Sequence, residues 1–239
     1  MSYIFNTFFY NPLYNGLVFL IDIVPGGDAG VAVVLLTLVV SFLLFSISKS
    51  AIRSQMKLKE IEPELVLIKQ NPDKQEQARL MIALYQKHHI NPFSMILLLL
   101  LQIPILFALY YVFYKGGLPE IHTEILYSFV KVPTEVNMHF LGILDISQKS
   151  WIVALVAGVT QFIQARLVAP PPAVAKDTKA TFSQDFAHSM HMQMKYTFPA
   201  IIFLIGLSFP SALPLYWSTR NVFTIGQELF LRKKRNTKL

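Results

Sequence analysis

Apolar residues gather along this chain in stretches that approach the roughly 20 residues a helix needs to cross a lipid bilayer. Four stretches are almost wholly apolar, and they cover residues 29–47, 93–114, 151–168 and 196–213. A fifth, residues 213–231, has the length but also carries polar and charged residues. Gly- and Pro-rich breaks separate the stretches. The pattern predicts an all-α integral membrane protein whose core, residues 29–231, contains five transmembrane helices.

Shorter amphipathic segments complete this architecture. Residues 12–25 are too few to span a bilayer, so we expect an interfacial helix within an extracytoplasmic segment 1–28. Residues 49–92 predict a helical hairpin with a turn at Asn71-Pro72-Asp73 and a kink at Pro63. Apolar residues recur at helical spacing on its two arms, at Leu58, Ile61, Leu65 and Ile68 and at Ala78, Met81, Ile82 and Tyr85.

The distribution of charge gives this architecture an orientation. Only 15% of the residues are charged and 54% are hydrophobic, whereas an ordinary soluble chain has about 25% charged residues. Of the 21 Lys and Arg residues, 17 fall in the hairpin, in a loop 169–195 with its membrane edge, and in a tail 232–239. The positive-inside rule predicts that these segments are cytoplasmic. The N-terminus and a loop 115–150 are then outside, and the lack of Lys and Arg in residues 1–30 argues against a secretory signal peptide.

Polar residues inside the predicted spans are the candidate functional groups. In the fifth span they include Arg220. Placing a charged side chain at the centre of a bilayer costs roughly 2.5–3.5 kcal/mol, so such a residue usually faces a watery cavity or a partner. These polar residues fall on one face of a helix, at Trp217, Arg220, Asn221, Thr224 and Gln227. A stripe of this length is too polar for lipid and predicts a hydrophilic groove, open to the cytoplasm, where Glu228 and the basic tail follow.

The other spans add scattered polar residues to this candidate groove, namely Thr37, Ser41, Gln102, Thr160, Gln161 and Gln164. Ser, Thr and Gln between membrane helices commonly do no more than hydrogen-bond a neighbouring helix. For Thr37, Ser41 and Gln102 taken singly, that structural role is the simpler interpretation.

The sequence offers little support for a metal site or for catalytic residues. The absence of Cys excludes disulfides and thiolate metal sites. His188 and His191 have Met residues around them that are typical of soft-metal sites, but no carboxylate or Cys cluster supports such a site. The spans contain no nucleophile–base pair, phosphate-binding Gly loop or paired carboxylates. We therefore expect no enzyme activity, no metal and no other cofactor.

Basic residues of the hairpin and tail allow two interpretations. They are either a solvated charged face or a docking surface for lipid headgroups, ribosomal RNA or a charged partner. The length of the hairpin favours docking, because some 40 residues are more than a loop needs to reconnect two spans. The candidate contact residues are Arg53, Lys57, Lys59, Lys69, Lys74, Arg79, Lys87, Arg232, Lys233, Lys234 and Arg235.

Long phrases of the sequence point to one family. They are FNTFFYNPLYNGLVFL, IEPELVLIKQNPDKQEQARLMIALYQKHHINPFSMILLLLLQIPILFALYYVF, HFLGILDISQKSWIVALVAGVTQFIQARL and FPSALPLYWSTRNVFTIGQ. In these phrases and in the order of its apolar segments, the chain resembles the YidC/Oxa-type membrane protein insertases, in their compact bacterial form. The resemblance implies five helices around a hydrophilic groove that is open to the cytoplasm and to lipid. It also implies that a client's polar segment enters the groove while the client's apolar helix slides into the bilayer.

Two positions depart from the family's pattern. The family usually carries an Arg in the first span, four residues after a Thr, and this chain has Thr37 but Ser41 at the Arg position. The family's aromatic residue in the last span corresponds to Trp217, and three residues later, where a small or polar residue is usual, stands Arg220. Ser41 and Arg220 would lie at similar depth, since each follows its matched residue by about one helical turn. We hypothesise that the groove charge has moved to the fifth span.

The resemblance also implies partners and a location. Nascent membrane proteins are the expected clients, the ribosome and the Sec translocon are candidate partners, and membrane lipids surround a multi-pass protein of the bacterial plasma membrane. No small-molecule substrate is expected. Two other classes stay open. A small solute channel or transporter would need a second polar opening, which the sequence does not offer, and an assembly scaffold would hold partner helices without moving a polar segment.

Overall fold

The computed structural model describes residues 3–91, 93–114, 118–168 and 193–236, and most of these residues are helical. The main helices of the bundle are α2 (Asn11–Ile23), α3 (Ala29–Leu43), α4 (Phe45–Glu60), α7 (Phe93–Tyr114), α8 (Trp151–Val168), α10 (Phe198–Ser208) and α11 (Ala212–Asn236). The hairpin consists of α5 (Glu62–Lys69) and α6 (Lys74–Lys87). The described residues also form short helical elements: α1 (Tyr3–Phe5), the π-helices η1 (Asn6–Tyr10) and η4 (Gln193–Thr197), and the 3₁₀ turns η2 (Pro25–Gly27) and η3 (Thr123–Ile125).

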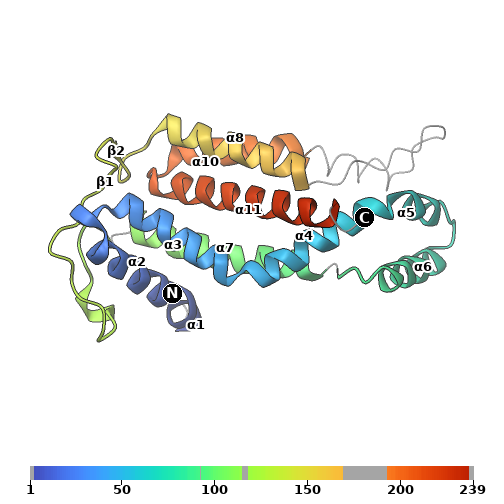
Figure 1. Ribbon diagram of the computed structural model, residues 1–239, viewed down its shortest axis with the longest axis horizontal. Coiled ribbons are helices and arrows are strands. Elements are labelled where there is room, and N and C mark those ends of the chain that lie inside the picture. Colours follow the sequence, from blue (N-terminus) through green and yellow to red (C-terminus); the bar gives the residue numbers. More distant parts are fainter. Residues whose placement is uncertain (1–2, 92, 115–117, 169–192, 237–239) are drawn as a thin grey trace.

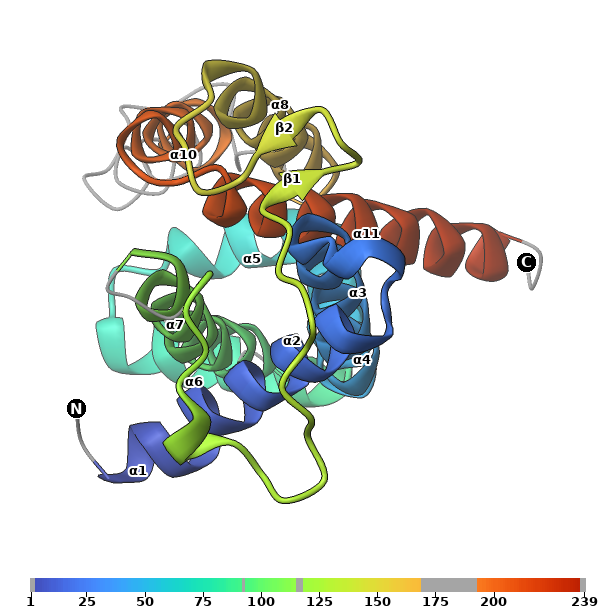
Figure 2. The ribbon, with the colours of Figure 1, turned by 90° about the vertical axis from the view of Figure 1, so that its left-hand side faces the viewer.

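The helices form an elongated bundle (Figure 1). Helix α11 lies in its middle and packs against α8 on one side and α3 on the other, while α10 packs against α8 and α4 packs against α7. The view along the bundle shows the same layers, with α8 and α10 on one side of α11 and α3 and α7 on the other (Figure 2). The hairpin α5–α6 projects from one end of the bundle, and a small β-hairpin lies at the opposite end (Figure 1).

Helix α2 covers the bundle at the N-terminal end of α3. It matches the predicted helix at 12–25 and buries one face, Leu13, Tyr14, Leu17, Val18 and Ile21, against α3 and α7. Asn15 fixes the following loop, because its Nδ2 donates to the carbonyl of Ile125 at 2.9 Å and its Oδ1 accepts from the N–H of Tyr127 at 2.6 Å. The sequence did not predict this anchoring role for Asn15.

The first predicted span, 29–47, is not one straight helix. Helix α3 ends at Leu43 and α4 begins at Phe45, and the two are bent by 64° relative to each other. Helical hydrogen bonds continue across the bend, from the N–H of Leu44 to the carbonyl of Val40 and from Ser48 to Leu44. Within the described residues no single helix combines the length and the apolarity for a bilayer crossing, whereas α3 and most of α4 meet both demands as a bent pair.

The hairpin confirms the first predicted apolar stripe and corrects the second. The two arms meet through Ile61, Leu65, Leu84 and Ile90, with Leu58, Ile68, Met81 and Tyr85 packed around them. Ala78 and Ile82, which were predicted to face the seam, are exposed. The predicted and the observed seam are overlapping faces of one helix. The predicted face contains positions 78, 81, 82 and 85, and the observed face contains positions 81, 84 and 85. Contact with the first arm selects the second face.

The turn and the kink lie where the sequence predicts them. Asp73 caps α6, with its Oδ1 accepting from the N–H groups of Gln75 and Glu76 at 2.8 and 3.4 Å. Pro63 stands in the first turn of α5, where its missing N–H costs no helical hydrogen bond, so the chain breaks before it, at Ile61.

The loop 115–150 contains a two-stranded hairpin that the sequence did not predict. Strand β1 (His139–Phe140) pairs antiparallel with β2 (Leu144–Asp145). Asp28 ties the hairpin to α3, because its Oδ1 accepts from Val31 N–H at 2.9 Å, as an N-cap, and its Oδ2 accepts from Leu141 N–H at 2.7 Å. Gly30 lets Phe140 lie directly on α3, since a Cβ at Gly30 would come within 2.5 Å of that side chain.

Small residues join the last three helices closely. Helix α8 has the predicted bounds, but α10 ends at Ser208, earlier than the predicted 213, and α11 starts at Ala212. A Cβ on Gly206 of α10 would lie 2.9 Å from the Cβ of Ala154 on α8. Such close backbone approach at small residues is typical of helices packed in membranes. Helix α11 continues to Asn236, so the first part of the predicted basic tail is helical.

Candidate functional site

The polar stripe of α11 lies inside the bundle. Arg220 exposes 9% of its surface, Asn221 exposes 2%, and Thr224 and Gln227 are equally well buried. Their spacing places them on the face of α11 that packs against the neighbouring helices. Ser41, Thr37 and Gln161 from α3 and α8 are buried as well. The structure thus brings most of the predicted groove residues into one polar interior.

Several members of the stripe are paired with polar residues on other helices. Trp217 Nε1 donates to Gln161 Oε1 on α8 at 3.1 Å. Asn221, one helical turn further along α11, donates from Nδ2 to the Oγ1 of Thr160, the residue before Gln161 on α8, at 3.2 Å. These pairs have the helix-joining role that polar residues commonly have between membrane helices, since each hydrogen bond satisfies a polar group and connects α11 to α8. Gln164, one turn beyond Gln161, is half-buried on α8.

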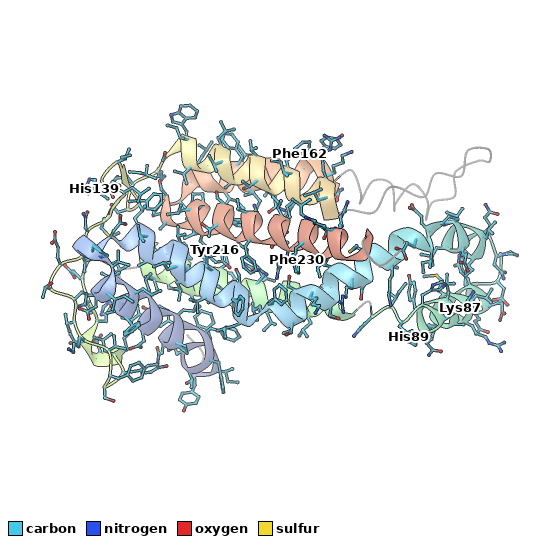
Figure 3. The ribbon with its side chains drawn as sticks, viewed as in Figure 1. Lys87, His89, His139, Phe162, Tyr216 and Phe230 are labelled. Atoms are coloured by element: carbon cyan, nitrogen blue, oxygen red, sulfur yellow. The ribbon has the colours of Figure 1, made fainter. Side chains whose placement is uncertain are left out.

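A tyrosine that the sequence analysis missed connects α11 to α7. Tyr216 is 3% exposed, and its hydroxyl is hydrogen-bonded to Gln102 Nε2. Figure 3 shows Tyr216 on the side of α11 that faces α3 and α7. The sequence signal was present, because Tyr216 is in the same apolar stretch and a buried tyrosine hydroxyl usually finds a partner. Gln102 therefore has the helix-joining role that was its simpler interpretation.

Two hydroxyl groups of the interior are satisfied by their own helices. Thr37 Oγ1 donates to the carbonyl of Val33 at 2.6 Å, and Thr224 Oγ1 donates to the carbonyl of Arg220 at 3.0 Å. Both are i to i−4 bonds, which Ser and Thr commonly make inside helices. These two residues line the polar interior but offer little hydrogen-bonding capacity to anything else.

Arg220 and Ser41 differ from the paired residues around them. Arg220 Nη1 and Ser41 Oγ are buried, and neither atom has a hydrogen-bond partner within the part of the chain that the structure describes. In that part Arg220 also forms no ion pair. The two residues stand on α11 and α3, which pack against each other. Buried polar groups are nearly always hydrogen-bonded, so these two atoms have hydrogen-bonding capacity left for a new partner.

At the end of the interior near the hairpin, α11 meets α4 and α8. Ser48 Oγ donates to Gln227 Oε1 at 2.8 Å, while Gln227 Nε2 has no partner among the described residues. Glu228 is 2% exposed and pairs with Arg232 at 2.8 Å. Arg232 was a predicted docking residue of the tail. It holds this carboxylate and donates to the carbonyl of Leu167 at the end of α8, at 2.5 Å, while its docking role stays a prediction.

The outer surface of the bundle is largely apolar, in contrast to the polar interior around Arg220. Large exposed apolar side chains cover α3, α7, α8 and α10, among them Val39, Phe42, Leu43, Leu100, Phe107, Ile152, Val159, Ile201 and Leu204. Val222, two residues beyond Arg220, is also exposed. Soluble proteins rarely expose contiguous apolar surface of this extent, which marks a surface covered by lipid or by protein.

The predicted docking residues of the hairpin are mostly at the surface. Arg53, Lys74, Arg79 and Lys87 are exposed, and Arg79 and Lys87 lie near Glu76 and Glu64, at 3.6 and 3.9 Å. Lys57 is the exception, because its Nζ donates to the carbonyls of His88 and His89 at 2.9 and 3.3 Å. Lys233 is exposed near the end of α11. The side chains of Lys59, Lys69, Lys234 and Arg235 lie outside the described residues.

The structure does not test the histidine pair of the sequence analysis, since His188 and His191 lie outside the described residues. In the described ranges, no three His, Asp or Glu side chains come together in a geometry that could hold a metal ion.

Comparison with known proteins identifies relatives over almost the whole chain. The family model described as 60Kd inner membrane protein matches residues 20–238. The membrane protein insertase YidC of Wolinella succinogenes is 32% identical over 240 residues, which cover 100% of this chain and 39% of the relative. The protein of the same name from Ectopseudomonas mendocina is 26% identical and is covered to 36%. The one from Clostridium tetani is 29% identical, with 87% of this chain and 84% of the relative covered.

The chain therefore spans about two fifths of the first two relatives and most of the third. The family match extends from the end of α2 to the tail, and so includes every helix that contributes to the polar interior. The resemblance stated from the sequence phrases is confirmed: the chain belongs to the YidC/Oxa family of membrane proteins, which the family model describes as the 60Kd inner membrane protein.

Proposed function

We propose that this protein is a membrane protein insertase of the bacterial inner membrane, as the names of its relatives suggest. One observation supports this most directly. The bundle has an apolar outer surface and a polar interior, and in that interior Arg220 Nη1 and Ser41 Oγ are buried without a partner among the described residues. A bundle that only had to sit in lipid would gain nothing from an unpaired buried charge, which is costly.

In the proposed mechanism, the interior receives a short polar segment of a client. Arg220 attracts carboxylates of that segment, and this attraction is stronger in a low-dielectric interior than in water. Ser41 and the Nε2 group of Gln227 hydrogen-bond its backbone. The client's apolar helix meanwhile contacts the exposed apolar side chains of the bundle and partitions into lipid, so the apolar transfer supplies the driving force. A single positive charge keeps the complex weak enough to dissociate.

The proposed orientation follows the positive-inside rule. The N-terminus and the loop with β1 and β2 are outside, and the hairpin α5–α6 and the end of α11 are in the cytoplasm. The basic side chains are concentrated on that side of the bundle, which supports the assignment. We propose that the hairpin contacts clients, with the ribosome and the Sec translocon as further partners.

This chain carries its buried positive charge on α11, at Arg220, and has Ser41 on α3 where the family usually has an Arg. We propose that Arg220 on α11 takes the role that an Arg at position 41 has in relatives. Helices α3 and α11 are in contact, and both Ser41 and Arg220 are buried, which the relocation requires.

Insertion into liposomes tests both proposals. The full chain is reconstituted, and a single-span client with an acidic tail is scored for protection of the tail from protease. Loss of one charge-assisted hydrogen bond, worth about 1.5–3 kcal/mol, should lower insertion by Arg220→Ala by roughly tenfold or more. Arg220→Lys should retain most activity. The control Arg166→Ala removes an exposed arginine of α8 and should insert like the wild type.

A double variant separates the two claims. Adding Ser41→Arg to Arg220→Ala should restore insertion if the charge has moved between the two helices. If Arg220→Ala inserts as well as the wild type, the groove-charge mechanism is wrong. If the double variant stays inactive, the relocation is wrong while the role of Arg220 stands.

A further inference from the structure

An open pocket of about 710 Å³ lies beside the bend between α3 and α4. Its walls come from α4, from the end of the hairpin at His89 and Asn91, and from Leu231 of α11. None of the groove residues lines this pocket. It is a second polar site, separate from the interior that holds Arg220.

The pocket is cationic. Lys49, Arg53 and Lys57 line it at intervals of four residues, which places them on one face of α4. Glu60 is the one carboxylate in the described lining, and it lies seven residues beyond Arg53, about 10 Å along the helix axis. Among the described residues, Lys49 and Arg53 form no hydrogen bond or ion pair. The hydroxyls of Ser46 and Ser50 line the same stretch.

Lys57 gives the pocket a fixed wall. Its ammonium group donates to the carbonyls of His88 and His89, at 2.9 and 3.3 Å, and so holds the end of the hairpin against α4. Carbonyl oxygens orient the ammonium group without neutralising its charge. The wall that carries Lys57 is therefore both positioned and positive.

An apolar face leads directly into this cationic pocket. On α3, Leu35, Val39 and Phe42 are exposed, and the same helical face continues on α4 with Ser46, Lys49 and Arg53. The helical hydrogen bonds across Leu44 keep the two halves in register through the bend. The helical face thus changes from apolar at Phe42 to cationic at Lys49, within about two helical turns.

We propose that this face binds one anionic phospholipid, with its phosphate between Lys49 and Arg53 and its acyl chains along Leu35, Val39 and Phe42. The proposal rests on α3 crossing the bilayer, as in the proposed function. An anionic headgroup with apolar tails matches both halves of the face, and basic pockets at the cytoplasmic ends of membrane helices are suited to such headgroups. An acidic peptide would match only the cationic half.

Native mass spectrometry of the full chain in detergent tests the proposal with phosphatidylglycerol and phosphatidylcholine of equal chain length. We expect the first phosphatidylglycerol to bind roughly tenfold more tightly than phosphatidylcholine, because each nearby Lys or Arg contributes about 1 kcal/mol. Lys49→Gln with Arg53→Gln should abolish this preference. The control, Lys131→Gln with Lys149→Gln, removes two exposed charges from the loop 115–150 and should keep it.

Three results would overturn the proposal. The first is an equal loss of preference in both double variants. The second is displacement of the lipid by inorganic phosphate alone at equal concentration, which would make the pocket a site for a free anion. The third is that the wild type binds both lipids equally tightly but does bind an acidic peptide. Arg220→Ala should retain the lipid preference, so a failure of the insertase proposal would be distinguishable.

Discussion

Arg232 lies one helical turn beyond Glu228 on α11, and its Nε donates to the buried carboxylate at 2.9 Å. The same guanidinium donates from Nη2 to the carbonyl of Leu167 on α8. Arg220, three turns earlier on the same helix, has a buried Nη1 without any such partner among the described residues. The two arginines therefore differ in pairing, since one joins two helices through its guanidinium and the other has a buried guanidinium nitrogen without a partner among the described residues.

Removing Arg232 should destabilise the protein. In Arg232→Ala the carboxylate of Glu228, which is 2% exposed, loses its partner, and the end of α8 loses a tie to α11. We expect a loss of about 1–3 kcal/mol in the free energy of unfolding, the usual cost of an unpaired buried polar group. Thermal unfolding in detergent measures it. Arg79→Ala, which removes an exposed pair with Glu76, should change stability by less than about 1 kcal/mol. Equal effects of the two variants would contradict the assignment.

Removing Arg220 should have the reverse effect on stability. Replacing a buried, incompletely paired charge by an apolar residue of similar volume is often neutral or stabilising by about 1–4 kcal/mol. Arg220→Met should therefore unfold at the same or a higher temperature than the wild type while its insertion activity falls. A variant that lost stability in proportion to its loss of activity would show that Arg220 supports the fold instead.

Packing of α10 on α8 should depend on a glycine. A Cβ at Gly206 would come within 2.9 Å of the Cβ of Ala154, so Gly206→Val must push the helices apart, at a cost of about 1–3 kcal/mol. Gly226 on α11 is the matched control, because its Cβ would meet nothing within 4 Å. Gly226→Ala should be neutral or stabilising by up to about 1 kcal/mol, as expected for a helix interior. Thermal unfolding of both variants gives the comparison, and a Gly206→Val protein as stable as the wild type would refute the close packing.

Asp28 should hold the β-hairpin against α3. Asp28→Ala removes both the N-cap of α3 and the bond to Leu141 N–H, and we expect it to cost about 1–2 kcal/mol. Amide hydrogen exchange should become faster around β1 and β2 in particular. Asp22→Ala, at an exposed position of α2, should leave exchange there unchanged. Uniformly faster exchange across the protein would instead indicate general destabilisation.

Sequence patterns predicted those parts of the fold that depend on local periodicity. The bounds of α7 and α8 are the predicted ones, and the polar residues of α11 lie on one helix face, which is buried except at the half-buried Trp217. Apolar length and helical period are properties of a single segment, so they can be read without knowledge of its neighbours.

Features that depend on a partner could not be predicted in this way. Leu84 faces the hairpin seam while Ile82 does not, and that choice is made by contact with the first arm. The pairing of Gln102 with Tyr216 and of Arg232 with Glu228 joins or fixes helices whose relative placement the sequence did not give. Arg232 looked like one more cation of a basic tail because its charge was visible and its buried partner was not.

The central claim is that a client's polar segment enters the interior between α3 and α11. Site-specific photo-crosslinking from position 41 to a client during its translation tests it most directly, because this position leaves Arg220 intact. Position 222, on the exposed outer face of α11, is the control. The account predicts that the probe at 41 reacts with the client's polar segment and the probe at 222 reacts only with its apolar helix. Crosslinks from position 41 only to finished apolar helices would contradict the account and favour a scaffold that moves no polar segment.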